Sequence, residues 1–92
     1  MVNERIEKLN AFLQANPTDP FINHALALEW IKAGDDAKAR AYFEANVQQN
    51  APYVATYYHL GKLMERNGDA DAAIKLYEQG MDYAQKAGDR HT

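Results

Sequence analysis

The chain has 92 residues, 47% hydrophobic and 25% charged, which is the composition of one small folded domain. Its formal net charge of −3 argues against a nucleic-acid-binding protein, because such proteins normally carry a basic face. The sequence contains neither cysteine nor serine, which excludes disulfides, thiolate metal sites and both cysteine and serine nucleophiles.

Residues 1–16 are predicted to form a helix. Asn3 is the expected N-terminal cap, and Asn16 followed by a proline ends the segment. One face of this helix is apolar, and its residues are Ile6, Leu9, Phe12 and Leu13.

Residues 19–51 are predicted to form a pair of helices. Asp19 stands directly before a proline, an arrangement typical of a helix start. Gly34 supplies a left-handed stop, and Asp35 or Asp36 then caps the second helix. The apolar residues at helical spacing are Ile22, Leu26, Trp30 and Ala33 in the first helix, and Ala39, Phe43 and Val47 in the second.

Residues 52–88 are predicted to form a second pair on the same plan, beginning at a proline. Gly68 ends the first helix, and Asp69 or Asp71 begins the second. Residues 89–92 remain as a tail. The residues presented at helical spacing are Tyr57, Leu60, Gly61 and Met64 in the first helix, and Ala73, Ile74, Tyr77 and Met81 in the second.

The two pairs are related by a constant offset, since Gly34 and Gly68 are 34 residues apart. The N-terminal helix joins this register, because Leu9 lies 34 residues before Phe43. The same offset relates Leu26 to Leu60, Ala27 to Gly61, Asp35 to Asp69, Ala39 to Ala73, Phe43 to Tyr77 and Glu44 to Glu78. A fixed period of this length is typical of repeat proteins. We therefore predict an all-α solenoid of helical hairpins with five antiparallel helices.

This spacing of large and small residues resembles the tetratricopeptide repeat (TPR) family over roughly residues 5 to 88. The residues that carry the resemblance are Asn23, Leu26, Ala27, Trp30, Ala39 and Phe43, and then Tyr57, Leu60, Gly61, Met64, Ala73 and Tyr77. The small residues allow paired helices to approach closely. Asn23 and Asn46 depart from the pattern, because the family prefers a large aromatic and a small residue there. A non-repetitive helical bundle is the alternative fold.

Asn67, Asp69 and Asp71 are spaced like the first ligands of a calcium-binding EF-hand loop. That loop needs glycine at its sixth position for a sharp turn, and Ala72 stands there instead. A helix stop followed by an aspartate cap explains the same residues. We therefore expect no calcium site.

Other chemistry-bearing residues are scattered. The three histidines are His24, His59 and His91, none of them paired at the i, i+4 spacing of a zinc site. Carboxylates such as Glu29, Glu44, Glu65 and Glu78 are spread along the helices without converging. We predict a protein that is not an enzyme and carries no metal or cofactor.

Binding is instead expected on the surface. In helical solenoids the first helices of successive units line the concave side. The predicted partner-binding residues are Phe21, His24, Leu28, Lys32, Tyr58, His59, Lys62 and Arg66. These residues would suit a protein or peptide partner with apolar and acidic side chains. The alternative is that Phe21 and Leu28 pack against the N-terminal helix while the charges are only solvated.

The TPR resemblance does not extend to the carboxylate clamp of chaperone-binding members. His24 and Leu28 stand where the clamp would need lysine and asparagine. We therefore expect no binding of chaperone tails.

Repeat arrays normally end in a capping helix whose outer face is polar, but the last helix of this chain is rich in apolar residues. These residues are Ile74, Tyr77, Met81 and Tyr83. We expect that the chain is part of a longer protein, or that another copy or a partner covers this edge, as in a homodimer through the last helix.

The leading hypothesis is a non-catalytic protein–protein interaction module that binds on its concave face or open C-terminal edge. The alternative is a structural or assembly domain that self-associates or packs against the rest of a larger protein. No apolar run is long enough to cross a membrane and no signal core is present, so we expect a cytoplasmic protein.

Overall fold

The computed structural model describes residues 4–49 and 53–89, with side chains described as far as residue 86. These residues form five α-helices and, over the same ranges, no strand. The helices are α1 (Glu4–Ala15), α2 (Pro20–Lys32), α3 (Asp36–Gln48), α4 (Val54–Arg66) and α5 (Ala70–Asp89). The predicted all-α fold of helical hairpins is confirmed. The expected cap Asn3, the proline at 52 and residues 90–92 of the predicted tail lie outside the described residues.

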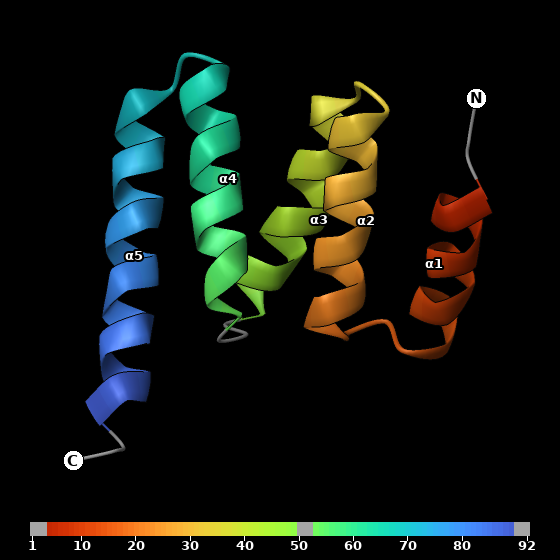
Figure 1. Ribbon diagram of the computed structural model, residues 1–92, viewed down its shortest axis with the longest axis horizontal. Coiled ribbons are helices and arrows are strands. Elements are labelled where there is room, and N and C mark those ends of the chain that lie inside the picture. Colours follow the sequence, from red (N-terminus) through yellow and green to blue (C-terminus); the bar gives the residue numbers. More distant parts are fainter. Residues whose placement is uncertain (1–3, 50–52, 90–92) are drawn as a thin grey trace. The chain divides into compact units, whose positions relative to one another are not determined.

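The chain divides into two compact units, unit 1 (Met1–Ala51) and unit 2 (Pro52–Thr92). Unit 1 contains α1, α2 and α3, with α2 and α3 joined as a helical hairpin, and unit 2 contains the hairpin of α4 and α5 (Figure 1). None of the helices in the described ranges is long and apolar enough to cross a lipid bilayer.

The two Gly-Asp turns have the same local geometry. Gly34 and Gly68 adopt φ angles of +86° and +88°, a left-handed conformation that glycine tolerates best. After each glycine an aspartate caps the next helix. The Oδ1 atom of Asp35 accepts a hydrogen bond from the Lys38 N–H at 3.1 Å, and Asp69 Oδ1 accepts one from Ala72 N–H at 3.1 Å. The stops are confirmed, and the caps are Asp35 and Asp69.

In unit 1, apolar side chains attach α1 to α2. Ile6, Ile22 and Leu26 form the buried cluster, with Leu9, Leu13, Trp30 and Tyr42 packed around it. An ion pair reinforces this contact, because Arg5 Nε donates to Glu29 Oε2 at 2.9 Å. The Tyr42 hydroxyl on α3 also donates to Asn10 Oδ1 at 3.3 Å.

The two asparagines that depart from the family pattern are buried and form hydrogen bonds. Asn46 on α3 is 1% exposed, and its Nδ2 donates to the Pro20 carbonyl at the start of α2 at 2.8 Å. Asn23 Nδ2 donates to the Asp19 carbonyl at 3.4 Å. The amide of Asn46 thus joins the two helices of the hairpin where the family usually relies on a small side chain.

In unit 2, α4 and α5 approach closely at two glycines. A Cβ atom on Gly61 would lie 2.5 Å from Tyr77 Cε1, and one on Gly80 would lie 2.9 Å from Tyr57 Cβ. Each tyrosine therefore packs against the backbone of the opposite helix. The buried apolar residues of this unit are Tyr57, Leu60, Leu63, Met64, Ala73 and Leu76.

These contacts predict that alanine is tolerated less well at Gly80 than at Gly61. The Tyr57 Cβ is fixed to its backbone, so Gly80→Ala must push the helices apart, whereas the half-buried Tyr77 ring can swing toward solvent. We expect Gly80→Ala to lower the free energy of unfolding by about 1 kcal/mol, because overpacking of roughly 1–3 kcal/mol outweighs the gain in helix propensity. Gly61→Ala should lower it by a smaller amount, because the ring can move but loses its hydrogen bond to Glu65.

Thermal unfolding followed by circular dichroism measures both variants. A Gly80→Ala protein as stable as the unmodified chain would contradict the close approach of α4 and α5.

Candidate partner-binding surfaces

The predicted partner-binding residues of α2 lie around one hollow in unit 1, which we call the unit 1 face. Its volume is about 390 Å³. The lining residues are Arg5, Phe21, His24, Ala25, Leu28, Glu29, Ile31 and Lys32. Phe21 is 59% exposed, so it does not bury itself against α1 as the alternative interpretation required. Leu28 is half-buried. The hollow thus presents one accessible aromatic ring beside aliphatic side chains.

His24 differs from the prediction, because the structure places most of it in the core. It is 6% exposed, and its ring lies against Phe43 with the centroids 5.4 Å apart. Packing against Phe43 fills space inside the hairpin, which periodicity alone does not reveal. A partner in this hollow could reach only a small part of the imidazole.

The charges of the unit 1 face centre on a buried carboxylate. Glu29 is 6% exposed and accepts from Arg5 Nε at 2.9 Å, with Lys32 Nζ at 3.6 Å from the same oxygen. Arg5, Glu29 and Lys32 together have a net charge of +1, and the two cationic side chains are exposed. The sequence prediction contained Lys32 but missed Arg5 and Glu29, since their ion pair joins residues 24 positions apart.

The predicted residues of α4 are mostly exposed, and we call them the unit 2 face: Tyr58, His59, Lys62 and Arg66. Tyr58 is 55% exposed, and Lys62 Nζ lies 5.9 Å from the centre of its ring. Lys62 and Arg66 line a hollow of about 260 Å³ together with Glu65. His59 is half-buried, and burial lowers its pKa below the ordinary 6.5, so it is neutral at pH 7.

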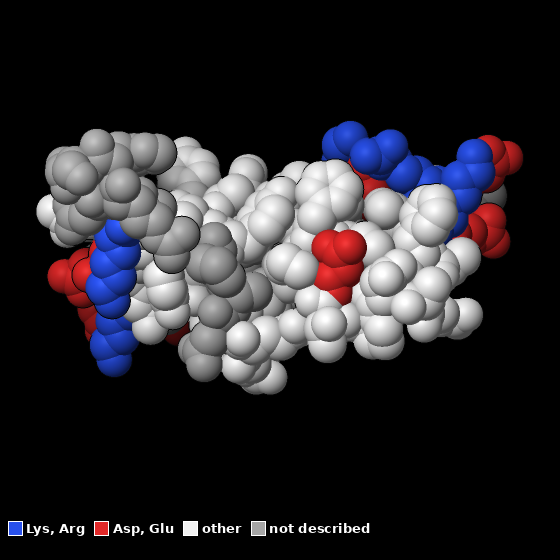
Figure 2. All heavy atoms as spheres, turned by 90° about the horizontal axis from the view of Figure 1, so that it is seen from below, with Lys and Arg blue, Asp and Glu red and all other residues white. Residues whose placement is uncertain are grey.

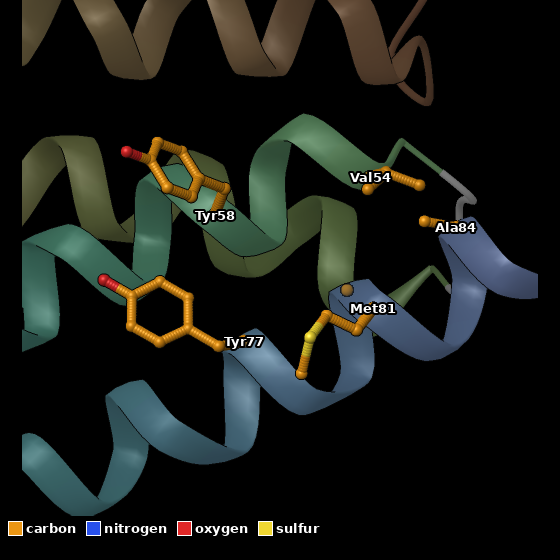
Figure 3. A pocket seen from close by; sticks show the side chains of 6 residues that line it. Val54, Tyr58, Tyr77, Met81 and Ala84 are labelled. Atoms are coloured by element: carbon orange, nitrogen blue, oxygen red, sulfur yellow. The ribbon is translucent and has the colours of Figure 1, made fainter.

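A third hollow lies between α4 and α5 and has an almost wholly apolar lining (Figure 3). We call it the α4–α5 hollow, and its volume is about 450 Å³. Its lining residues are Val54, Tyr58, Tyr77, Gly80, Met81 and Ala84. Only Tyr58 was among the predicted partner-binding residues. For the other lining residues, the sequence signal was the crowding of apolar side chains such as Tyr77 and Met81 on the last helix.

Tyr77 on α5 and Tyr57 on α4 each contact a side chain of the other helix. The Tyr77 hydroxyl donates to Glu65 Oε1 at 2.9 Å, and burial together with this bond raises the pKa of Tyr77 above its ordinary value. The Tyr57 ring lies against the Tyr83 ring in a tilted arrangement, with the centroids 5.3 Å apart. Burial and the neighbouring Tyr83 raise the pKa of Tyr57 to about 12. Both phenols are therefore neutral at physiological pH.

Two kinds of site are absent among the described side chains. They form no metal centre, and on the face seen in Figure 2 they form no large patch of a single charge. No three histidine, cysteine, aspartate or glutamate residues among them come close enough to hold a metal ion. Figure 2 shows both signs of charge and no continuous basic field across that face. The arrangement favours contacts through apolar hollows with charged rims.

Comparison with known proteins found relatives among repeat proteins, although no family model matches the chain. The TPR repeat-containing protein PA0015 from Pseudomonas aeruginosa is 29% identical over 85 residues, covering 92% of this chain and 81% of that protein. A TPR domain protein of known structure from Salinibacter ruber is 47% identical, with a TM-score of 0.72, over 76% of this chain and 78% of that one.

The structure of MamA is similar in fold. It superposes with a TM-score of 0.85 at 20% identity over 91% of this chain. The chain spans about half of the MamA chain, 49% of its length.

Proposed function

The chain belongs to the tetratricopeptide repeat family, and we propose that it is a non-catalytic module that binds a protein or peptide partner. Relatives in this family support a protein-interaction or scaffold role in general. The proposal assigns the partner to the unit 1 face and to the unit 2 face. We further propose that the partner presents apolar and acidic side chains to them.

The observation that carries this proposal is the pairing of an exposed aromatic ring with nearby cations on each face. Phe21 and Tyr58 are 59% and 55% exposed. Lysine lies near each ring, as Lys32 lines the same hollow as Phe21 and Lys62 lies over Tyr58. Large exposed aromatic side chains are the residues that most often dominate binding energy at interfaces. Adjacent ammonium groups would favour carboxylates on the partner.

We predict that alanine at these rings weakens partner binding. Tyr58→Ala with Lys62→Ala, and separately Phe21→Ala with Leu28→Ala, should each lower affinity by about tenfold or more, since aromatic anchors contribute about 2 kcal/mol. Capture from the source cell identifies the partner, and calorimetric titration of the purified partner measures the change.

Gln79→Ala is the matched control, because Gln79 is exposed on α5 outside both faces. If both double variants bind the partner as tightly as the unmodified chain does, the proposed faces are wrong.

A second candidate function is an assembly domain that self-associates through α5 or packs there against the rest of a larger protein. The exposure of Ile74 at 55% and Met81 at 64% favours it, because exposed apolar side chains on one helix often mark an interface.

Sedimentation velocity over a range of concentrations tests this second candidate. Self-association through α5 predicts a dimer that Met81→Glu converts to monomer, whereas Phe21→Ala leaves it unchanged. A chain that stays monomeric at high concentration would eliminate the homodimer.

A further inference from the structure

We propose that Arg5 on α1 binds a carboxylate of the partner with its two terminal Nη groups, and that the buried Glu29 on α2 is the residue that positions it. The inference rests on the proposed partner-binding function and adds the residue that selects the acidic side chain of the partner. The site lies at one end of the unit 1 face, where the start of α1 lies beside the last turn of α2 (Figure 1).

The bond to Glu29 uses only one of the five N–H donors of the Arg5 guanidinium. Arg5 Nε donates to Glu29 Oε2 at 2.9 Å, and among the described residues the Arg5 side chain makes no further hydrogen bond. The four donors on its two Nη atoms are thus not engaged by the described residues, and the side chain is 67% exposed. Two parallel N–H groups of a guanidinium match the two oxygens of a carboxylate.

Glu29 can position the guanidinium because its own side chain is confined. That side chain is 8% exposed, and burial of this extent restricts its rotamers. Arg5 is therefore held at Nε before a ligand arrives, and less side-chain freedom is lost on binding. Another pair in unit 1 differs, because the side chains of Arg40 and Glu44 are 52% and 40% exposed and neither is confined.

The charges around Arg5 leave this end of the unit 1 face positive. Glu4 and Glu7 are one position before and two positions after Arg5, so they lie on other sides of α1. Lys8 is three positions after Arg5 and shares its side of the helix. At the end of the hairpin, the Asp35 carboxylate is engaged in capping α3. An anionic group is therefore attracted to this end of the face.

The other end of the same hollow is apolar, and this sets the spacing of the ligand. The exposed Phe21 is eight positions before Glu29 on α2, a distance of roughly 12 Å along the helix. In an extended peptide, which rises about 3.3 Å per residue, side chains about four positions apart span this distance and point the same way. The ligand is therefore an extended segment with an apolar side chain and, about four residues away, an aspartate or glutamate.

Three synthetic peptides test the proposal, each of about eight residues and blocked at both ends so that a side chain supplies the carboxylate. The first carries phenylalanine and glutamate four positions apart. The second has glutamine in place of the glutamate, and the third has the glutamate directly beside the phenylalanine. Titration of the full chain followed by NMR, including the Arg5 Nε–H signal, measures each affinity. We expect the first peptide to bind about fivefold more tightly than the other two.

Replacing Arg5 by lysine separates its shape from its charge. Arg5→Lys keeps one positive charge but cannot donate two parallel hydrogen bonds, so the first peptide should bind about fivefold more weakly. Arg40→Lys is the matched control, because it makes the same exchange in an arginine–glutamate pair of the same unit, outside the residues that line the hollow. It should leave the affinity unchanged.

Two variants of Glu29 test its positioning role. Glu29→Met raises the net charge of Arg5, residue 29 and Lys32 from +1 to +2. A site that acted by charge alone would then bind the first peptide more tightly, whereas loss of positioning should weaken binding about threefold. Glu29→Gln also removes the negative charge but keeps an oxygen that can accept from Arg5 Nε, so it should bind at least as tightly as the unmodified chain. If circular dichroism shows that Glu29→Met loses helix, the Arg5→Lys measurement decides alone.

Four results would overturn the inference: no binding of the first peptide at roughly 10 mM, equal binding of the glutamate and glutamine peptides, full affinity in Arg5→Lys, or tighter binding by a folded Glu29→Met chain. If the inference fails while Phe21→Ala with Leu28→Ala still weakens the native partner, the proposed function stands without it. If that double variant also binds the native partner normally, the unit 1 face itself is wrong.

Discussion

The close approach of α4 and α5 at Gly61 and Gly80 is the constraint on which the candidate surface of unit 2 depends. Because neither glycine has a Cβ, Tyr57 and Tyr77 can lie against the opposite backbone. This contact turns Tyr58 and Met81 to the sides of the apolar α4–α5 hollow (Figure 3). A hairpin spread apart by larger residues would lose both the contact and the hollow.

Much of the fold could be predicted because its signals are local. A glycine followed by an aspartate stops one helix and caps the next within four residues, at Gly34 and again at Gly68. The 34-residue offset between these two turns then predicts which helices pair as hairpins. The role of Asn46 could not be predicted, since its amide bonds to a carbonyl 26 residues away. Periodicity also could not place His24, whose burial depends on the position of Phe43.

The candidate surfaces were predicted less completely than the helices. Sequence reasoning identified the exposed rings Phe21 and Tyr58, because they lie opposite the packing stripe of their helices. It missed the Arg5–Glu29 ion pair and the α4–α5 hollow, both of which depend on two helices meeting in space. A list of residues on one helix face therefore describes part of a surface whose other part comes from the neighbouring helix.

The central claim is that α4 and α5 approach closely at Gly61 and Gly80, and nuclear Overhauser contacts across the hairpin test it most directly. The Gly80 Hα protons should show contacts to Tyr57, and the Gly61 Hα protons should show contacts to the Tyr77 ring. A well-folded helical chain that shows neither set of contacts would contradict the claim.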